Sequence, residues 1–160
     1  MSLRSAIVDG LIADAGINAL IAGRCYDRFF EFEDFLNQKA NANKFPVMTV
    51  ESEQAENEQN QDGHDNLNTA LFTITCYTQV HLGKLRSRST TVRAAQKTIM
   101  RDLDTLSDLV VTYLNSLSGT LGSYYIRNSH VENGAQDGVF ESEDNREIIS
   151  TQISLQIIYS

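Results

Sequence analysis

The stretch over residues 90–117 constrains the fold of this chain most, because its apolar residues recur at alternating steps of four and three. Val92 and Ala95 extend the stripe backwards from its main members, which are Ile99, Leu103, Leu106, Val110, Tyr113 and Leu117. Such spacing places the side chains on one face of an α-helix. The stripe is short for a coiled coil, so it favours a helix lying across a sheet.

Local signals bound this predicted helix at both ends. Ser89 can serve as its N-cap, and Gly119 with Gly122 ends the element. The same pattern allows two helices that are broken near Ser107-Asp108. We therefore expect either one long helix or two shorter ones in this stretch.

Alternating apolar and polar residues predict the strands. The C-terminal residues alternate from Ile149 to Tyr159, and residues 69–80 show the same period of two. Pro46 opens another short strand, 46–51, because proline at the first residue of a strand costs no hydrogen bond of the ladder. We expect this strand to pair antiparallel with 69–80. Residues 124–132 form a shorter, mixed strand.

The N-terminal residues read as helical. Leu3, Ile7, Val8, Leu11 and Ile12 form one apolar stripe, with Ser2 as N-cap and Gly16 as stop. Residues 17–21 fit one further turn, and 24–27 look extended. The order of elements predicts an α+β domain over residues 1–160, with a four-stranded antiparallel or mixed sheet and an N-terminal helix and one long helix packed on one face.

Composition excludes several classes of protein. The 160 residues carry 13 Lys plus Arg against 21 Asp plus Glu, a formal net charge of −8, which argues against tight binding to nucleic acid or anionic lipid. No apolar run is long enough to cross a membrane, and the N-terminus lacks the pattern of a signal peptide. Cys25 and Cys76 lack metal or redox spacing, so we expect reduced, buried, cytoplasmic thiols.

No catalytic, cofactor or metal motif is present in the sequence. Phosphate-binding glycine loops, zinc-binding His pairs and the serine-nucleophile motif are all missing. His130 and Glu132 could share a strand face, but two ligands make no catalytic metal site. We expect no enzyme and no cofactor; a small cytoplasmic enzyme or ligand-binding domain is the hypothesis from another class.

Charge is segregated along the chain. Residues 51–66 hold six acids, no Lys or Arg and one apolar residue, which predicts a mobile loop or a pair of solvated strand extensions. Residues 84–101 hold six bases and no acid, and Arg93, Lys97 and Arg101 lie four apart on one helix flank. This flank is a solvated face, a nucleic-acid contact, or a counter-surface for an acidic loop of a neighbouring copy.

The last alternative predicts subunit contacts. An acidic arm with Glu53, Glu56 and Glu58 suits head-to-tail association with the basic flank of the next copy. Four phenylalanines fall between residues 29 and 35. They are either core residues or an apolar patch for a partner subunit, in which Phe32 and Phe35 would be the anchors.

The layout of the chain resembles the tail terminator, or tail completion, proteins of long-tailed bacteriophages. The resemblance rests on the N-terminal helix, the strand 69–80, the long helix, the terminal Ile157-Ile158-Tyr159 and two short motifs, Gly23-Arg24-Cys25-Tyr26-Asp27 and Phe45-Pro46-Val47-Met48-Thr49-Val50. Residues 29–44 and 51–66 look longer than in that family, so no contact is carried over to them.

The resemblance implies a specific role and set of partners. The chain would form a ring, a hexamer, on the last ring of tail tube protein, end tube polymerisation and provide the surface for head attachment. Its partners would be other copies of itself, the tail tube protein and a head-side connector protein, with DNA passing through the lumen without tight binding. It would sit in the virion tail after assembly in the bacterial cytoplasm. Another neck component, a head-tail joining or stopper protein, is the alternative role.

Overall fold

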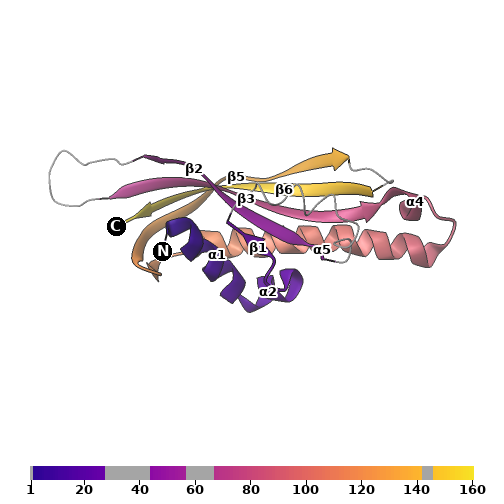
Figure 1. Cartoon of the computed structure of the whole chain (residues 1–160), viewed down its shortest axis with the longest axis horizontal. Coiled ribbons are helices and arrows are strands. Elements are labelled where there is room, and N and C mark those ends of the chain that lie inside the picture. The colour runs from indigo at the N-terminus through magenta and orange to yellow at the C-terminus, as the bar shows by residue number, and fades with distance from the viewer. Residues whose placement is uncertain (1, 28–43, 57–66, 142–145) are drawn as a thin grey trace.

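The computed structural model describes residues 2–27, 44–56, 67–141 and 146–160. Its frame is a six-stranded sheet with the order β1-β2-β3-β6-β5-β4 (Figure 1). The strands are β1 (Cys25–Tyr26), β2 (Val47–Glu56), β3 (Asn68–His81), β4 (Gly119–Leu121), β5 (Tyr124–Glu141) and β6 (Arg146–Tyr159). Only β1 pairs in parallel, with β2, and the other neighbours are antiparallel.

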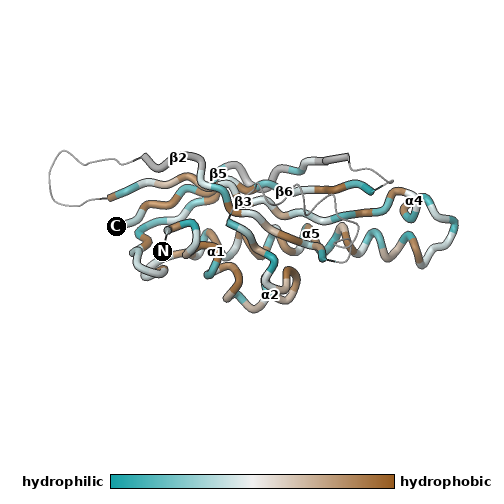
Figure 2. Tube along the Cα trace, in the orientation of Figure 1, coloured by the Kyte–Doolittle hydropathy of each residue, from teal (hydrophilic) through white to brown (hydrophobic). Residues whose placement is uncertain are grey.

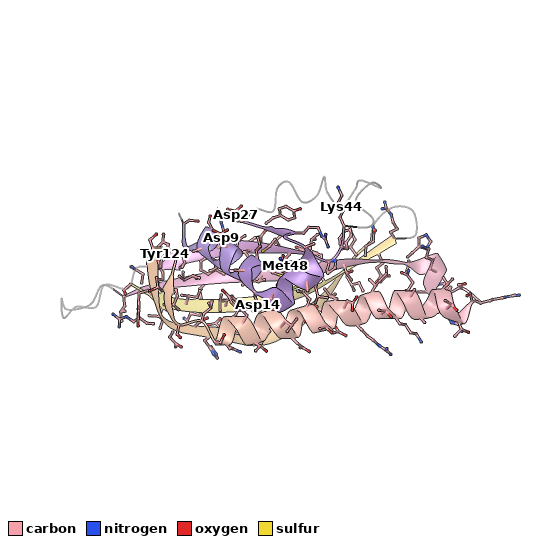
Figure 3. The ribbon with its side chains drawn as sticks, turned by 90° about the horizontal axis from the view of Figure 1, so that it is seen from below. Asp9, Asp14, Asp27, Lys44, Met48 and Tyr124 are labelled. Carbon is pink, nitrogen blue, oxygen red and sulfur yellow. The ribbon has the colours of Figure 1, made fainter. Side chains whose placement is uncertain are left out.

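The described helices cover one face of the sheet. These are α1 (Leu3–Ala13), α2 (Ala15–Ile21) and the long α5 (Thr90–Asn115), while the single turn α4 (Leu82–Leu85) follows the end of β3 (Figures 1 and 3). Every second residue of the strands meets these helices in one continuous core, which includes Phe72, Ile74, Ile153 and Leu155. Apolar residues are most continuous along α2 and the adjoining end of α1 (Figure 2).

The N-caps lie where the sequence predicts them. The Ser2 side chain accepts the N–H of Ser5 at 3.1 Å, and the Ser89 side chain accepts the N–H of Val92 at 3.4 Å. Asp14, which the sequence reading did not assign, accepts the N–H of Ile17 at 2.9 Å and so starts α2 directly after α1. The two N-terminal helices are therefore fixed by local hydrogen bonds as well as by their apolar faces.

The long helix is continuous, so the alternative of a break near Ser107-Asp108 is wrong. Ser107 is buried and its hydroxyl donates to the carbonyl oxygen of Asp104, which satisfies the side chain without interrupting the helix. The predicted stripe is buried at Leu103, Leu106 and Val110. Ala95, which the sequence assigned to the stripe, is exposed, because the N-terminal end of α5 extends past the ends of the strands (Figure 1).

The predicted count of four strands is also wrong. β1 and β4 add two short strands that have only two and three residues. Neither is long enough to show a period of two, and each forms by pairing with a longer neighbour. Gly119 and Gly122, both with positive φ, start β4 and make the tight turn into β5.

The predicted antiparallel pairing of 46–51 with 69–80 is confirmed, with Val47 opposite Tyr77 and Val50 opposite Ile74. Residues 51–56 continue β2 through an irregularity between Ser52 and Ala55, as expected of a strand extension. Residues 57–66 lie outside the described part of the chain.

Candidate assembly surface

The basic residues predicted as a contact surface lie at one end of the molecule. Lys97 and Arg101 are exposed on α5. Arg93 differs from them, because it is half-buried and its Nη1 donates to the carbonyl oxygen of Ser87 at 2.8 Å. Arg93 therefore also holds the loop that precedes α5. Lys84, Arg86 and Arg88 lie in α4 and in that loop, and these six residues are called the basic tip below.

Two polar contacts fix the basic tip to the sheet. The buried Gln96 accepts the backbone N–H of His81 through its Oε1 at 2.9 Å, which joins α5 to the last residue of β3. His81 in turn accepts the N–H of Lys84 through its Nδ1 at 3.2 Å and so caps α4. Because both contacts use His81, the charged end is held at a defined position on the strand.

The acidic residues lie at the opposite end. Glu51, Glu53 and Glu56 are in β2, where Glu56 pairs with Thr69 at the start of β3, whereas α4 begins directly after the end of β3 (Figure 1). Twelve steps along β3 separate the two ends, roughly 40 Å for an extended strand. Glu56 therefore lies far from α4 and the loop that follows it within one subunit, whereas Glu51, opposite Thr73, lies nearer the middle of β3.

Three of the predicted contact residues cannot be placed. Glu58, Phe32 and Phe35 lie outside the described ranges, as do Phe29 and Phe30.

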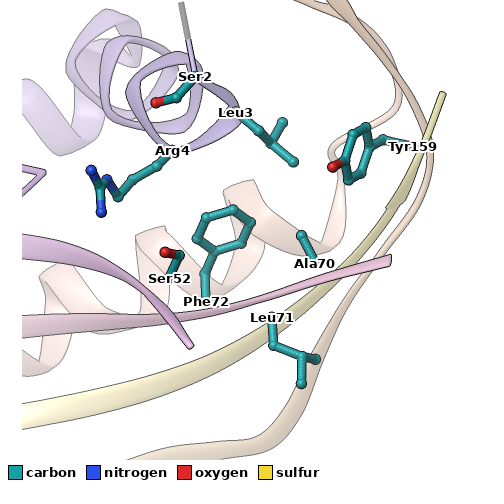
Figure 4. A pocket seen from close by; sticks show the side chains of 8 residues that line it. All are labelled: Ser2, Leu3, Arg4, Ser52, Ala70, Leu71, Phe72 and Tyr159. Atoms are coloured by element: carbon teal, nitrogen blue, oxygen red, sulfur yellow. The ribbon is translucent and has the colours of Figure 1, made fainter. Parts of the chain in front are cut away.

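One small pocket opens between the start of α1 and the sheet (Figure 4). It has a volume of about 220 Å³, and its apolar lining includes Leu3, Phe72 and Tyr159. Arg4 also lines it, and the Nε of Arg4 is buried with no hydrogen-bond partner. The volume is below the roughly 300–1,000 Å³ of usual small-molecule sites, so a single side chain fits it better than a cofactor. No sequence motif pointed to it.

Both cysteines are buried, as predicted, and lie on either side of Met48, because Cys25 pairs with Met48 across β1–β2 and Cys76 pairs with it across β2–β3. Burial, and then the Asp27 carboxylate, raise the pKa of Cys25 to about 12. Burial, and then Cys25, raise the pKa of Cys76 as well. A thiol with a raised pKa is a poor nucleophile at neutral pH.

Neither a metal-binding cluster nor a membrane-spanning helix is found among the described residues. In residues 2–27, 44–56, 67–141 and 146–160, no group of three His, Cys, Asp or Glu is arranged to hold a metal ion. Among the helices of these same ranges, none combines the length and apolarity of a membrane-spanning segment.

Comparison with known proteins gives a structural match without a sequence match. No protein-family model matches the chain, and no curated protein matches it. A solved chain from the virion of a native gene transfer agent particle is 14% identical and superposes with a TM-score of 0.52, over 98% of this chain and 95% of its own. A second solved chain, 10% identical over 98% of this chain and 96% of its own, has a TM-score of 0.40 and supports no inference. This chain therefore shares its fold, over almost its whole length, with a chain of a gene transfer agent virion.

Proposed function

We propose that this chain is a non-enzymatic structural protein of a bacteriophage or phage-like particle. The observation that carries the proposal is the likeness in fold to a chain of a gene transfer agent virion, which spans 98% of this chain. The likeness covers 95% of the other chain as well, so it concerns the fold as a whole rather than one motif. The proposal places this chain, too, in a virion.

Within the particle, the proposed role is that of a tail terminator. Copies of the chain form a ring, a hexamer, that caps the tail tube, stops its polymerisation and offers a surface to the head-side connector protein. The resemblance of the sequence to tail terminator proteins supports this role. The ring assembles in the bacterial cytoplasm and becomes part of the virion tail, and DNA passes through its lumen without tight binding.

The distribution of charge supports a head-to-tail ring. The acids of β2 and the basic tip lie at opposite ends of a subunit, so each end can face the other kind of end in a neighbouring copy. Contacts of this heterologous type generate a ring when the rotation closes. Exposed ion pairs are worth about 0–1 kcal/mol each, so their role is to steer and orient the subunits.

The decisive experiment combines imaging with a tube-capping assay. The purified chain is imaged by negative stain and then added to polymerising tail tube protein of the same phage. We expect rings with a lumen, and tubes whose growth stops once one end carries a ring. Rings that bind the connector protein but leave tube growth unchanged would indicate another neck component. A monomer at all concentrations, with no effect on tubes, would contradict the proposal.

A further inference from the structure

The two outermost strands of the sheet cover only a small part of their neighbours. β1 pairs with β2 at Met48 and Thr49, and β4 pairs with β5 from Tyr124 to Ile126. Among the described strands, nothing pairs with the outer side of β2 from Glu51 to Glu56, nor with the outer side of β5 beyond Ile126. Open edges of this kind are templates for pairing with another chain.

The outward-facing groups of β2 follow from one hydrogen bond. The N–H of Met48 donates to the carbonyl oxygen of Arg24 at 2.9 Å, so Met48 directs its backbone groups away from β3. The pairing of β2 with β3 is regular from Val47 to Ser52, and backbone groups alternate in direction along such a strand. Val50 therefore directs its N–H towards Tyr26 of β1, and Ser52 directs its N–H and C=O groups to the open side.

The direction of the backbone groups at the start of β5 also follows from hydrogen bonds between main-chain atoms. Tyr125 and Ser160 exchange two backbone hydrogen bonds at 3.0 Å, which sets the alternation along β6. From Asn128 to Val131 the pairing with β6 is regular, so the backbone N–H and C=O groups of Ser129 and Val131 point away from β6. The end of α5 occupies this part of the edge, because the Asn115 side chain accepts the N–H of Val131 at 3.1 Å and the Ser129 hydroxyl donates to Leu114.

Farther along β5, none of the described strands pairs with the outer edge. After the irregularity between Val131 and Ala135, the strand pairs regularly with β6 from Ala135 to Glu141. In this register Ala135, Asp137 and Val139 direct their backbone groups away from β6. The sheet thus has two open segments, residues 51–56 of β2 and residues 135–141 of β5, on opposite sides.

We propose that residues 135–141 of β5 in one copy pair with residues 51–56 of β2 in the next, so that one sheet continues around the ring. This inference rests on the proposed ring. The directions of the strands fit it, because β2, β3, β6 and β5 alternate and a second β2 placed beside β5 runs antiparallel to it. The seam has the same antiparallel pattern as the sheet on either side.

The positions of the open segments add a stagger to the seam. Asp137 lies in one row with Thr151, Cys76 and Met48, whereas residues 51–56 of β2 lie in rows nearer the opposite end. Two copies joined through these two segments are displaced relative to one another along the strand direction. Closure of a sheet into a barrel requires such a displacement. Since Glu141 and His81 lie at the same end, the displacement also brings the basic tip of one copy towards the acids of β2 in the next.

The charge on β2 disfavours the pairing of two β2 edges. Residues 51–56 of β2 hold three Glu and no Lys or Arg, so two β2 edges that met would bring like charges together across a strand pair, which is destabilising. Acidic residues on an open edge also limit unspecific aggregation.

The test removes one outward N–H from each edge. Ser52→Pro blocks the β2 edge and Asp137→Pro blocks the β5 edge, because proline has no N–H to donate. The controls Ser52→Ala and Asp137→Ala keep the N–H. We expect both proline variants to be monomers and both alanine variants to form rings. An equimolar mixture of the proline variants should give a dimer and no ring, because the pair retains one intact seam.

Several outcomes of this test would overturn the seam. A Ser52→Pro variant that dimerises alone indicates symmetric pairing of two β5 edges, and proline variants that form rings indicate that the edges are not used. Circular dichroism and the thermal midpoint of each variant show whether it is folded.

A second measurement uses the unmodified chain and does not depend on the proline variants folding. Hydrogen exchange at the amides of Ser52, Ala135 and Asp137 should slow at least tenfold when rings form, while exchange at the inward amides of Thr49 and Gln136 stays the same. Rings without this protection overturn the seam and leave the proposed function intact. Absence of any ring overturns both.

Discussion

The two halves of α5 share one helix and one apolar pattern, yet they have different surroundings. In the C-terminal half, Leu103, Leu106, Val110 and Leu114 are buried against the sheet. In the N-terminal half, Gln96 is the only buried side chain of residues 90–102, and Met100 is 40% exposed. A periodic stripe therefore specifies a helix, whereas the burial of its side chains depends on how far the sheet extends beneath the helix.

The largest expected effect on stability comes from the C-terminal half of α5, which is covered by the sheet; the N-terminal half is called the open half below. Leu106 is 0% exposed, so Leu106→Ala should lower the free energy of unfolding by about 2–5 kcal/mol through lost burial and a cavity. The matched change Met100→Ala in the open half should cost less than about 1 kcal/mol. Urea unfolding of the two variants measures both values. Equal losses would show that the two halves are packed alike.

The thiols beneath the helices make stability depend on pH. Because the pKa of Cys25 is raised to about 12, the folded chain keeps this thiol neutral, while the unfolded chain ionises it near its ordinary pKa. Its contribution is fully present below about pH 8.5 and is lost as pH rises towards 12, by up to about 1.4 kcal/mol per pH unit. Urea unfolding at pH 8 and pH 10 should show a smaller loss in Cys25→Ala than in the parent. An unchanged slope would show that Cys25 is accessible to solvent.

Reaction with iodoacetamide compares the covered and open regions directly. Cys25 and Cys76 should stay unmodified in the native chain at neutral pH, because they are buried and neutral. A cysteine introduced by Met100→Cys in the open half should react at a rate close to that of a free thiol. Mass spectrometry of the labelled peptides reports each site. Rapid labelling of Cys76 would contradict the burial of the sheet under the helices.

A smaller effect is expected from the charges of the open half. Changing Arg93, Lys97 and Arg101 to Glu should slow ring formation and make it less sensitive to salt, because the basic tip steers the acidic end of the next copy. The double variant Lys97→Gln with Arg101→Gln should fall between this variant and the parent, and it leaves the Arg93 contact to Ser87 in place. Light scattering after a concentration jump measures the rate. Unchanged kinetics would remove the basic tip from the interface.

The smallest expected effect concerns DNA. With a net charge of −8, the isolated chain should show no shift of duplex DNA in a low-salt gel titration. We predict that acids from residues 51–66 or 137–147 face the lumen and repel phosphates. The competing expectation is that Arg86, Arg88 and Arg93 line the channel. Binding that weakens steeply with added salt would favour those bases and end the idea of a repulsive channel.

Much of the fold could be predicted because its signals are local. The Ser2 and Ser89 caps and the alternation along residues 149–159 are set by residues that are neighbours in the sequence. Residues 24–27 were predicted to be extended, but their place in the sheet as β1 was not, and β4 was not predicted at all. Two or three residues show no period, and these strands form only against β2 and β5. Of the candidate surface, the segregation of charge was visible in the sequence, but the open edges of β2 and β5 were not.

The sequence by itself determined the long helix, the strands β3 and β6 and the separation of acidic from basic residues, because each depends on spacing or composition along the chain. It did not determine the length of β5, which extends from Tyr124 to Glu141. The tertiary structure alone decided that the acids of β2 and the basic tip lie at opposite ends, since β3 extends from one to the other. It also decided which strand edges stay open and that Ala95 is exposed while Leu106 is buried. These properties depend on contacts between residues that are distant in the sequence, and periodicity carries no information about such contacts.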